Sequence, residues 1–305
     1  MTKRTALIAL AILAVLAVLG WFSISRSSSD STTSSPAAMP GMTMGDGAST
    51  TTNPAMPGMG HAAPMSGMKP LVAGANGTRV SAGGLTLEPK HAMFMAAQPT
   101  QWQLRIVDHM GMPVTTFQRD QTKLMHLIVV RTDLTDYQHV HPVLGRGGIF
   151  TINLRLPRPG SYRAIADFTT GGRRYALGVP IQVPGTARQA PLPPEAMKQT
   201  VDGFSVEAVH GMPMAGTESK LDFVVSQDGK PVTRLLPYLG AYGHLVALRK
   251  PDLAYSHVHP TSEDRSKGLV SFVADFPTTG AYRLFLQFRT SSGVHTAPFT
   301  INVHG

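Results

Sequence analysis

An internal repeat in the second part of the chain constrains the fold more than any other feature. The segment His126–Pro142 aligns without a gap to His244–Pro260, and both segments begin with His-Leu and end with His-Val-His-Pro. The pattern Pro-x-x-Gly-x-Tyr-Arg follows at Pro157–Arg163 and again at Pro277–Arg283. A duplicated domain of about 105 residues explains both matches.

Each repeat shows the period-two hydrophobic alternation of half-buried strands. It is clear at Trp102, Leu104 and Ile106, and again along Tyr162–Phe168 and Tyr282–Phe288. Roughly seven short strands per hundred residues, separated by Pro and Gly, predict an all-β chain with two tandem immunoglobulin-like β-sandwich domains. We expect these domains at residues 77–186 and 198–305, with a Pro-rich linker at residues 187–197.

The N-terminus predicts export from the cytoplasm. Lys3 and Arg4 precede the apolar run Ala6–Ile24, whose nineteen residues would span about 28 Å as a helix. Basic residues before such a run favour an extracytoplasmic location for the remainder of the chain. Residues 1–25 therefore predict a signal anchor forming a single-pass transmembrane helix, and a cleaved signal peptide, which would make the protein secreted, is the alternative.

Residues 26–76 predict a disordered tether, because they are rich in Ser, Thr, Gly and Pro and poor in bulky aliphatic residues. Methionine is nevertheless concentrated there, at short spacings and without the other hydrophobic residues that a packed segment would contain. Thioether sulfur is a soft ligand that selects Cu(I). The predicted ligands in the tether are Met39, Met42, Met44, Met56, Met59, His61, Met65 and Met68.

Three histidines recur at the same spacing in both repeats. His139 and His141 are two residues apart and should share one face of a strand, and a hairpin would bring His126 opposite His141. Imidazole without thiolate suits Cu(II), Zn(II) or Ni(II). We expect metal sites at His126, His139 and His141 and at His244, His257 and His259. Structural histidines that bond to loop backbone are the alternative.

Further His and Met residues cluster near these trios and favour copper over zinc as the bound metal. Two His-x-Met-x-Met patterns would each share one strand face, and a third mixed cluster occurs in the first repeat only. The predicted ligands are His91, Met93 and Met95; His210, Met212 and Met214; and His109, Met110 and Met112.

Composition narrows the remaining classes of function. The chain has no Cys, which excludes disulfides, thiolate zinc sites, iron–sulfur clusters and a blue-copper centre. The formal charge of +9 favours binding to anionic surfaces. The sequence has no run of basic residues interleaved with aromatic residues, so it does not indicate a nucleic-acid partner. The sequence also lacks Gly-x-Ser-x-Gly, His-Glu-x-x-His and phosphate-loop motifs.

The repeated His-Leu-x-x-x-Arg…His-Val-His-Pro segment and the Pro-x-x-Gly-x-Tyr-Arg turn resemble those of secreted or membrane-anchored bacterial proteins with tandem immunoglobulin-like domains. These are similar to the YtkA-like and CopC-like groups. The resemblance covers roughly residues 80–304 and implies copper handling, with other envelope copper proteins as partners. It supplies no assigned ligand set.

Three functions follow as hypotheses. The first is a non-enzymatic, extracytoplasmic copper-binding protein for buffering, resistance or delivery, in which the Met-rich motifs and the His clusters hold the metal. The second is a passive adhesion or scaffold module of the envelope, which leaves the methionines of the tether unexplained. The third is a metalloenzyme similar to superoxide dismutase, which the absence of Cys and the single cluster per repeat disfavour.

Overall fold

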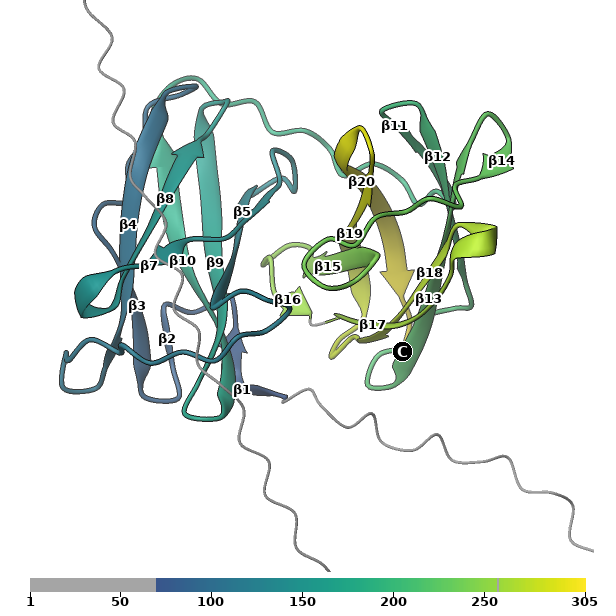
Figure 1. Ribbon diagram of the computed structural model, residues 1–305. Helices are drawn as coiled ribbons and strands as arrows, with labels where there is room; N and C mark the ends of the chain where they lie inside the picture. Colours follow the sequence, from purple (N-terminus) through teal and green to yellow (C-terminus); the bar gives the residue numbers. More distant parts are fainter. Residues whose placement is uncertain (1–69, 257) are drawn as a thin grey trace, which may run out of the picture. The chain divides into compact units, whose positions relative to one another are not determined.

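The computed structural model describes residues 70–256 and 258–305, which form two tandem immunoglobulin-like β-sandwiches (Figure 1). The N-terminal segment 1–69, including the expected anchor and the methionines of the tether, lies outside the described residues, as does His257. Within the described part of the chain, no helix has the length and hydropathy needed to cross a bilayer.

The first sandwich consists of β1 (Leu71–Asn76), β2 (Ser81–Ala82), β3 (Leu85–Pro89), β4 (Pro99–Asp108), β5 (Met125–Arg131), β6 (Gln138–Val140), β7 (Val143–Leu144), β8 (Ile149–Arg155), β9 (Gly160–Thr170) and β10 (Arg173–Val183), with the short 3-10 helix η1 (Arg146–Gly148) before β8. One sheet has the order β1-β10-β9-β5-β6 and the other β2-β3-β4-β8-β7.

The second sandwich consists of β11 (Lys198–Val201), β12 (Phe204–His210), β13 (Glu218–Gln227), β14 (Lys230–Pro231), β15 (Gly243–Arg249), β16 (Tyr255–Ser256), β17 (Val258–Asp264), β18 (Leu269–Asp275), β19 (Gly280–Thr290) and β20 (Gly293–Val303), with the 3-10 helix η2 (Arg265–Lys267) before β18. Its sheets have the orders β11-β12-β13-β18-β17, with β14 added to β13, and β16-β15-β19-β20.

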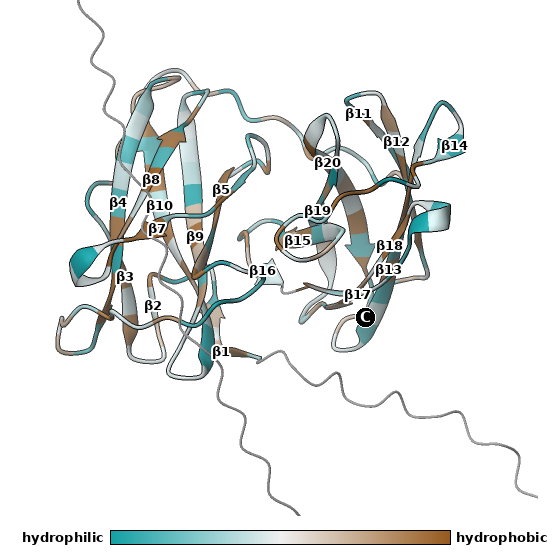
Figure 2. Cartoon of the chain, viewed as in Figure 1, coloured by the Kyte–Doolittle hydropathy of each residue, from teal (hydrophilic) through white to brown (hydrophobic). Residues whose placement is uncertain are grey.

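Each sandwich buries one apolar core between its two sheets. The alternation predicted from the sequence is confirmed in the first core, where Trp102, Leu104 and Ile106 of β4 pack with Tyr162 of β9. The equivalent alternation along β19 supplies the second core. Figure 2 shows the apolar bands on the strands interleaved with polar ones. The all-β, tandem-sandwich prediction is therefore confirmed for the described residues.

The first strand differs from the expected tether. Residues Leu71–Asn76 form β1, which pairs in parallel with β10, and its apolar residues Leu71, Val72 and Ala75 pack against neighbouring strands. The close approach depends on glycine: a Cβ on Gly178 would lie 1.8 Å from the carbonyl oxygen of Gly77, and Gly77 itself has φ = 79°. Residues 71–76 thus belong to the first sandwich.

Strand β5, the continuous apolar run of the first repeat, is buried on both faces, unlike the half-buried strands with alternating residues. Its inward residues Leu127 and Val129 belong to the first core, while Ile128 and Val130 belong to a separate apolar cluster. That cluster joins the two sandwiches. Its first-domain members are Ile128, Val130, Leu134, Ile165 and Ala176, and its second-domain members are Val246, Leu248, Leu253, Tyr255 and Phe285.

Candidate metal centre

The hairpin β5–β6 positions the three histidines of the first domain. Its register pairs Leu127 with Val140 and Ile128 with His139, and one further step places His126 opposite His141, as the sequence predicts. Leu127 and Val140 pack on the core, so alternation directs the three imidazoles to the other face. Strand β6 ends at Val140, so His141 lies just beyond the strand on which it was expected.

The three imidazoles form a compact cluster that can hold a metal ion, with one nitrogen of each ring within 4.8 Å of the others. His126 Nδ1 lies 3.0 Å from His139 Nε2 and 3.2 Å from His141 Nε2. Two nitrogens bound to one tetrahedral ion at ~2.0–2.1 Å are about 3.3 Å apart. The observed separations are close to that spacing.

The outer nitrogens fix the tautomers of two rings. His126 Nε2 lies 3.1 Å from the carbonyl oxygen of Asp120, which only accepts, so Nε2 carries the proton and Nδ1 has a lone pair. His139 Nδ1 likewise donates to Oε1 of Gln287 at 2.8 Å, while the Nε2 of Gln287 donates to Thr296. The lone pairs of His126 Nδ1 and His139 Nε2 therefore face each other.

Burial disfavours protonation of two of the three rings, His139 and His141. It lowers the pKa of His141 from 6.5 to about 3, with smaller contributions from His126 and Lys123. It also lowers the pKa of His139 well below the ordinary value, and the neighbouring His126 and His141 add to that shift. Because metals bind the deprotonated ring, protons compete weakly for these ligands near neutral pH.

The second domain places His244 as the first domain places His126. His244 Nε2 donates to the carbonyl oxygen of Tyr238, six residues earlier, just as His126 Nε2 donates to Asp120. Its Nδ1 instead lies 2.8 Å from the carboxamide of Gln121, and burial lowers its pKa. His257 is outside the described residues and the side chain of His259 is not described, so the second trio stays a prediction.

A small cavity of about 20 Å³ lies beside the cluster, between the two domains. His126 and His139 line it from the first domain, and His244 lines it from the second. The buried pair Asp167 and Arg174 also lines it, together with Tyr255, whose hydroxyl donates to Asp167 at 2.8 Å. The volume suits an ion or a single water molecule, not an organic substrate.

The two His-x-Met-x-Met patterns are not on shared strand faces, so that prediction is wrong. Residues 91–95 lie between β3 and β4, with Phe94 turned into the core and only a single bridge at Met93. In the second domain β12 ends at His210, and Pro213, which has no backbone N–H, lies within the continuation.

The thioethers of the described segments are accessible instead. Five of them are between 59% and 75% exposed, in the order Met95, Met112, Met93, Met212 and Met110. His109, Met110 and Met112 lie at a turn where Asp108 Oδ1 accepts from the backbone N–H of Met110 and Met112, both at 2.9 Å. Metal binding by these residues, and by Met214, remains a prediction.

The sequence did not indicate the residues that orient the cluster. Gln287 comes from β19 of the second domain, and Asp120 acts through its backbone carbonyl. A signal was present in the repeat, because Gln287 aligns with Asp167 once Tyr162 is aligned with Tyr282. The alignment shows that Gln287 and Asp167 occupy equivalent positions in the two repeats, but it does not reveal that Gln287 contacts His139 of the other domain.

The family described as Domain of unknown function (DUF8832) matches residues 79–185 and 199–305. The chain belongs to this family and contains two copies of its domain. The family description says nothing about copper, so the resemblance to copper-handling groups stays a prediction. Among curated proteins, no sequence matches this DUF8832 chain.

Several solved structures match the chain at low identity and with low TM-scores. The Escherichia coli adhesin FdeC is 14% identical, with 74% of this chain and 65% of that chain covered and a TM-score of 0.24. The S-layer protein SbsC, domains 5–6, is 11% identical with 72% and 96% covered and a TM-score of 0.23. The DUF8832 chain thus spans slightly less than two thirds of the adhesin chain, and its fold assignment rests on its own strand topology.

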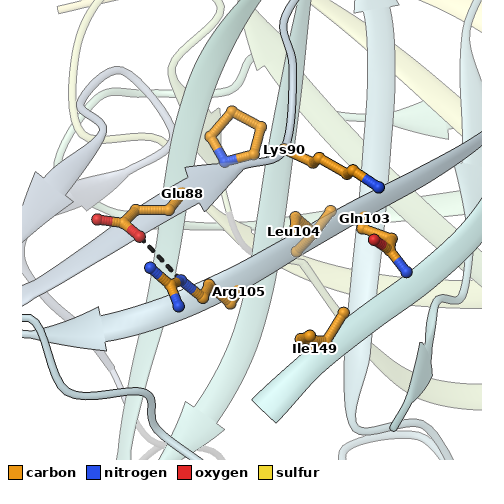
Figure 3. Close-up of a pocket in the computed structure, with 7 residues that line it drawn as sticks. Glu88, Lys90, Gln103, Leu104, Arg105 and Ile149 are labelled. Carbon is orange, nitrogen blue, oxygen red and sulfur yellow. Dashed lines mark hydrogen bonds and ion pairs between the residues drawn. The ribbon is translucent and has the colours of Figure 1, made fainter. Parts of the chain in front are cut away.

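A larger hollow of about 260 Å³ lies on the other sheet of the first domain and is separate from the histidines. Figure 3 shows Glu88 and Arg105 paired at its edge, with Leu104 and Ile149 close by. This ion pair is about half exposed and therefore contributes little to stability. None of the predicted metal ligands lines this hollow.

Proposed function

We propose that this protein is an extracytoplasmic, non-enzymatic metal-binding protein whose first domain holds one transition-metal ion between His126, His139 and His141. The observation that carries the proposal is the pair of facing lone pairs on His126 Nδ1 and His139 Nε2, 3.0 Å apart. Two such nitrogens repel each other unless a cation lies between them, and burial opposes filling that place with a proton.

Copper is the ion that we propose, for storage or delivery. Three imidazoles suit copper, zinc or nickel equally by ligand type. The exposed thioethers of both domains and the methionines of residues 39–68 add soft ligands for Cu(I). Such ligands would capture Cu(I) at the surface, while the three imidazoles of the cluster would hold Cu(II).

Binding rather than catalysis fits the surroundings of the cluster. His126 is 5% exposed, and the adjacent cavity has room for little more than one water molecule. Extracytoplasmic location is supported by the basic residues that precede Ala6–Ile24.

The test is a titration of the metal-free full chain with Cu(II), and separately with Zn(II), by competition with a chromophoric chelator. We expect one tight site that His139→Ala and His141→Ala each weaken at least a hundredfold. His304→Ala is the matched control, because it removes an exposed imidazole outside the cluster. Micromolar or weaker binding that His139→Ala and His141→Ala leave unchanged would overturn the proposal.

A second candidate is a metal-free scaffold or adhesion module of the envelope. One observation favours it: the 3.0 Å contact between His126 Nδ1 and His139 Nε2 could hold a single shared proton, and that hydrogen bond would lock the β5–β6 hairpin without a metal. In that case the chelator EDTA and added metal would both leave the thermal unfolding temperature unchanged, whereas a tight metal site raises it with metal concentration.

A further inference from the structure

We infer that the metal site of the first domain is completed by the second domain through Gln287, so that metal binding and domain docking stabilise each other. This inference rests on the proposed function. It assigns Gln287 as a positioning residue, because its side chain bonds to Nδ1 of His139, the ring nitrogen that faces away from the other two imidazoles. By linkage, anything that weakens docking then weakens metal binding, and the reverse.

Gln287 holds the tautomer that exposes the ligand nitrogen. Its Oε1 accepts from His139 Nδ1 at 2.8 Å, which leaves the lone pair on Nε2, and its own Nε2 donates to Thr296. Gln287 is 6% exposed, so water cannot replace this contact freely. Partners of this kind, bonded to the far nitrogen of a ligating histidine, typically contribute 10–100-fold to metal affinity.

A second chain of contacts runs from the cluster into the other domain. The backbone carbonyl of Asp120 accepts from His126, and its carboxylate lies 3.3 Å from Arg174 Nη1. Arg174 forms a buried, two-point ion pair with Asp167, which in turn accepts from Tyr255 of the second domain. The position of His126 is thereby tied to the interface.

The interface around these polar contacts is apolar and well packed. Tyr137, from the loop that leads to β6, stacks on Phe285 of β19 with ring centroids 3.9 Å apart and planes 5° apart. Phe285 and Gln287 point to the same face of β19 because they are two residues apart. The strand that supports docking is therefore the one that orients His139.

The first measurement is the metal affinity of the full chain with Gln287→Leu and with Gln287→Glu. We expect Gln287→Leu to bind metal 10–100-fold more weakly, and Gln287→Glu, which keeps an acceptor for His139, to remain within about threefold of the unmodified chain. Gln227→Leu is the matched control on an exposed strand position of the same domain.

The second measurement follows docking directly. Because the chain has no Cys, spin labels at Gln101→Cys and Glu207→Cys, both exposed, report one inter-domain distance. Urea should lengthen this distance, and bound metal should shift the midpoint of the lengthening to higher urea. In Gln287→Leu we expect that shift to shrink or vanish.

The outcomes separate the two claims. If His139→Ala loses the tight site while Gln287→Leu keeps its full affinity, the inference fails and the proposed function stands. A urea midpoint that metal leaves unmoved also overturns the inference. If the unmodified chain has no tight site at all, the proposed function fails, and the inference fails with it.

Discussion

His126 and His244 occupy the same place in the two domains but have different neighbours. Each lies on a central strand, and each donates from Nε2 to a carbonyl six residues earlier. His126 Nδ1 then faces two imidazoles, whereas His244 Nδ1 faces the carboxamide of Gln121 from the other domain. Duplication thus supplied the same preorganised histidine twice, and the residues opposite it decide whether that histidine can share an ion.

The largest expected difference between the two histidines is in metal affinity. His126→Ala should weaken the tight site at least a hundredfold, because it removes the nitrogen nearest to both other ligands. His244→Ala should leave the affinity within about tenfold, since it removes only a neighbour of the cavity. Competition titrations of both variants measure this. If His244→Ala abolishes tight metal binding, the assignment of the metal site to the three histidines of the first domain is wrong.

A smaller difference is expected between the tyrosines of the two Pro-x-x-Gly-x-Tyr-Arg turns, in how much each contributes to the free energy of unfolding. The hydroxyl of Tyr162 lies 2.8 Å from two acceptors, the carboxylate of Asp136 and the carbonyl oxygen of Arg158, and shares its single proton between them, whereas the hydroxyl of Tyr282 contacts the neutral Thr278. Hydrogen bonds to charged groups contribute more to stability than neutral ones. Tyr162→Phe should therefore lower the free energy of unfolding by about 2 kcal/mol and Tyr282→Phe by about 1 kcal/mol.

Urea denaturation of the two Tyr→Phe variants, with metal absent, measures that difference. An equal loss of unfolding free energy in both variants would mean that the contact of Tyr162 with Asp136 adds nothing to the stability of the first domain.

The smallest expected effect is the pH dependence of the metal-free chain. The pKa of His141 is about 3 in the folded state and near 6.5 in the unfolded state, so between these values only the unfolded chain takes up the proton. Stability should therefore fall as the pH is lowered from 7 to 6, by less than about 1 kcal/mol for this partly exposed ring.

Urea midpoints at pH 7 and pH 6 test this, and His141→Asn should show a smaller decrease than the unmodified chain. His139 and His244 should contribute in the same direction, because burial lowers the pKa of both. If His141→Asn keeps the full pH dependence, His141 is not the group responsible.

Local periodicity in the sequence predicts the strands and the faces on which their side chains lie. The alternation of Trp102 and its neighbours gives the strands, and the two-residue spacing of His139 and His141 places both on one face. The His-x-Met-x-Met patterns fail as strand faces because a connection between strands and a proline interrupt the ladder. Gln287 is invisible to such patterns, since its contact with His139 spans 148 residues and depends on how two folded domains dock.

The three-histidine site is tested most directly by X-ray absorption of the full chain loaded with one equivalent of zinc, which has no redox chemistry to complicate the spectrum. We expect three imidazole nitrogens at ~2.0–2.1 Å from the ion, with the outer-shell scattering of the rings, and the loss of one imidazole in His139→Ala. A first shell made only of oxygen ligands, unchanged in His139→Ala, would contradict this expectation.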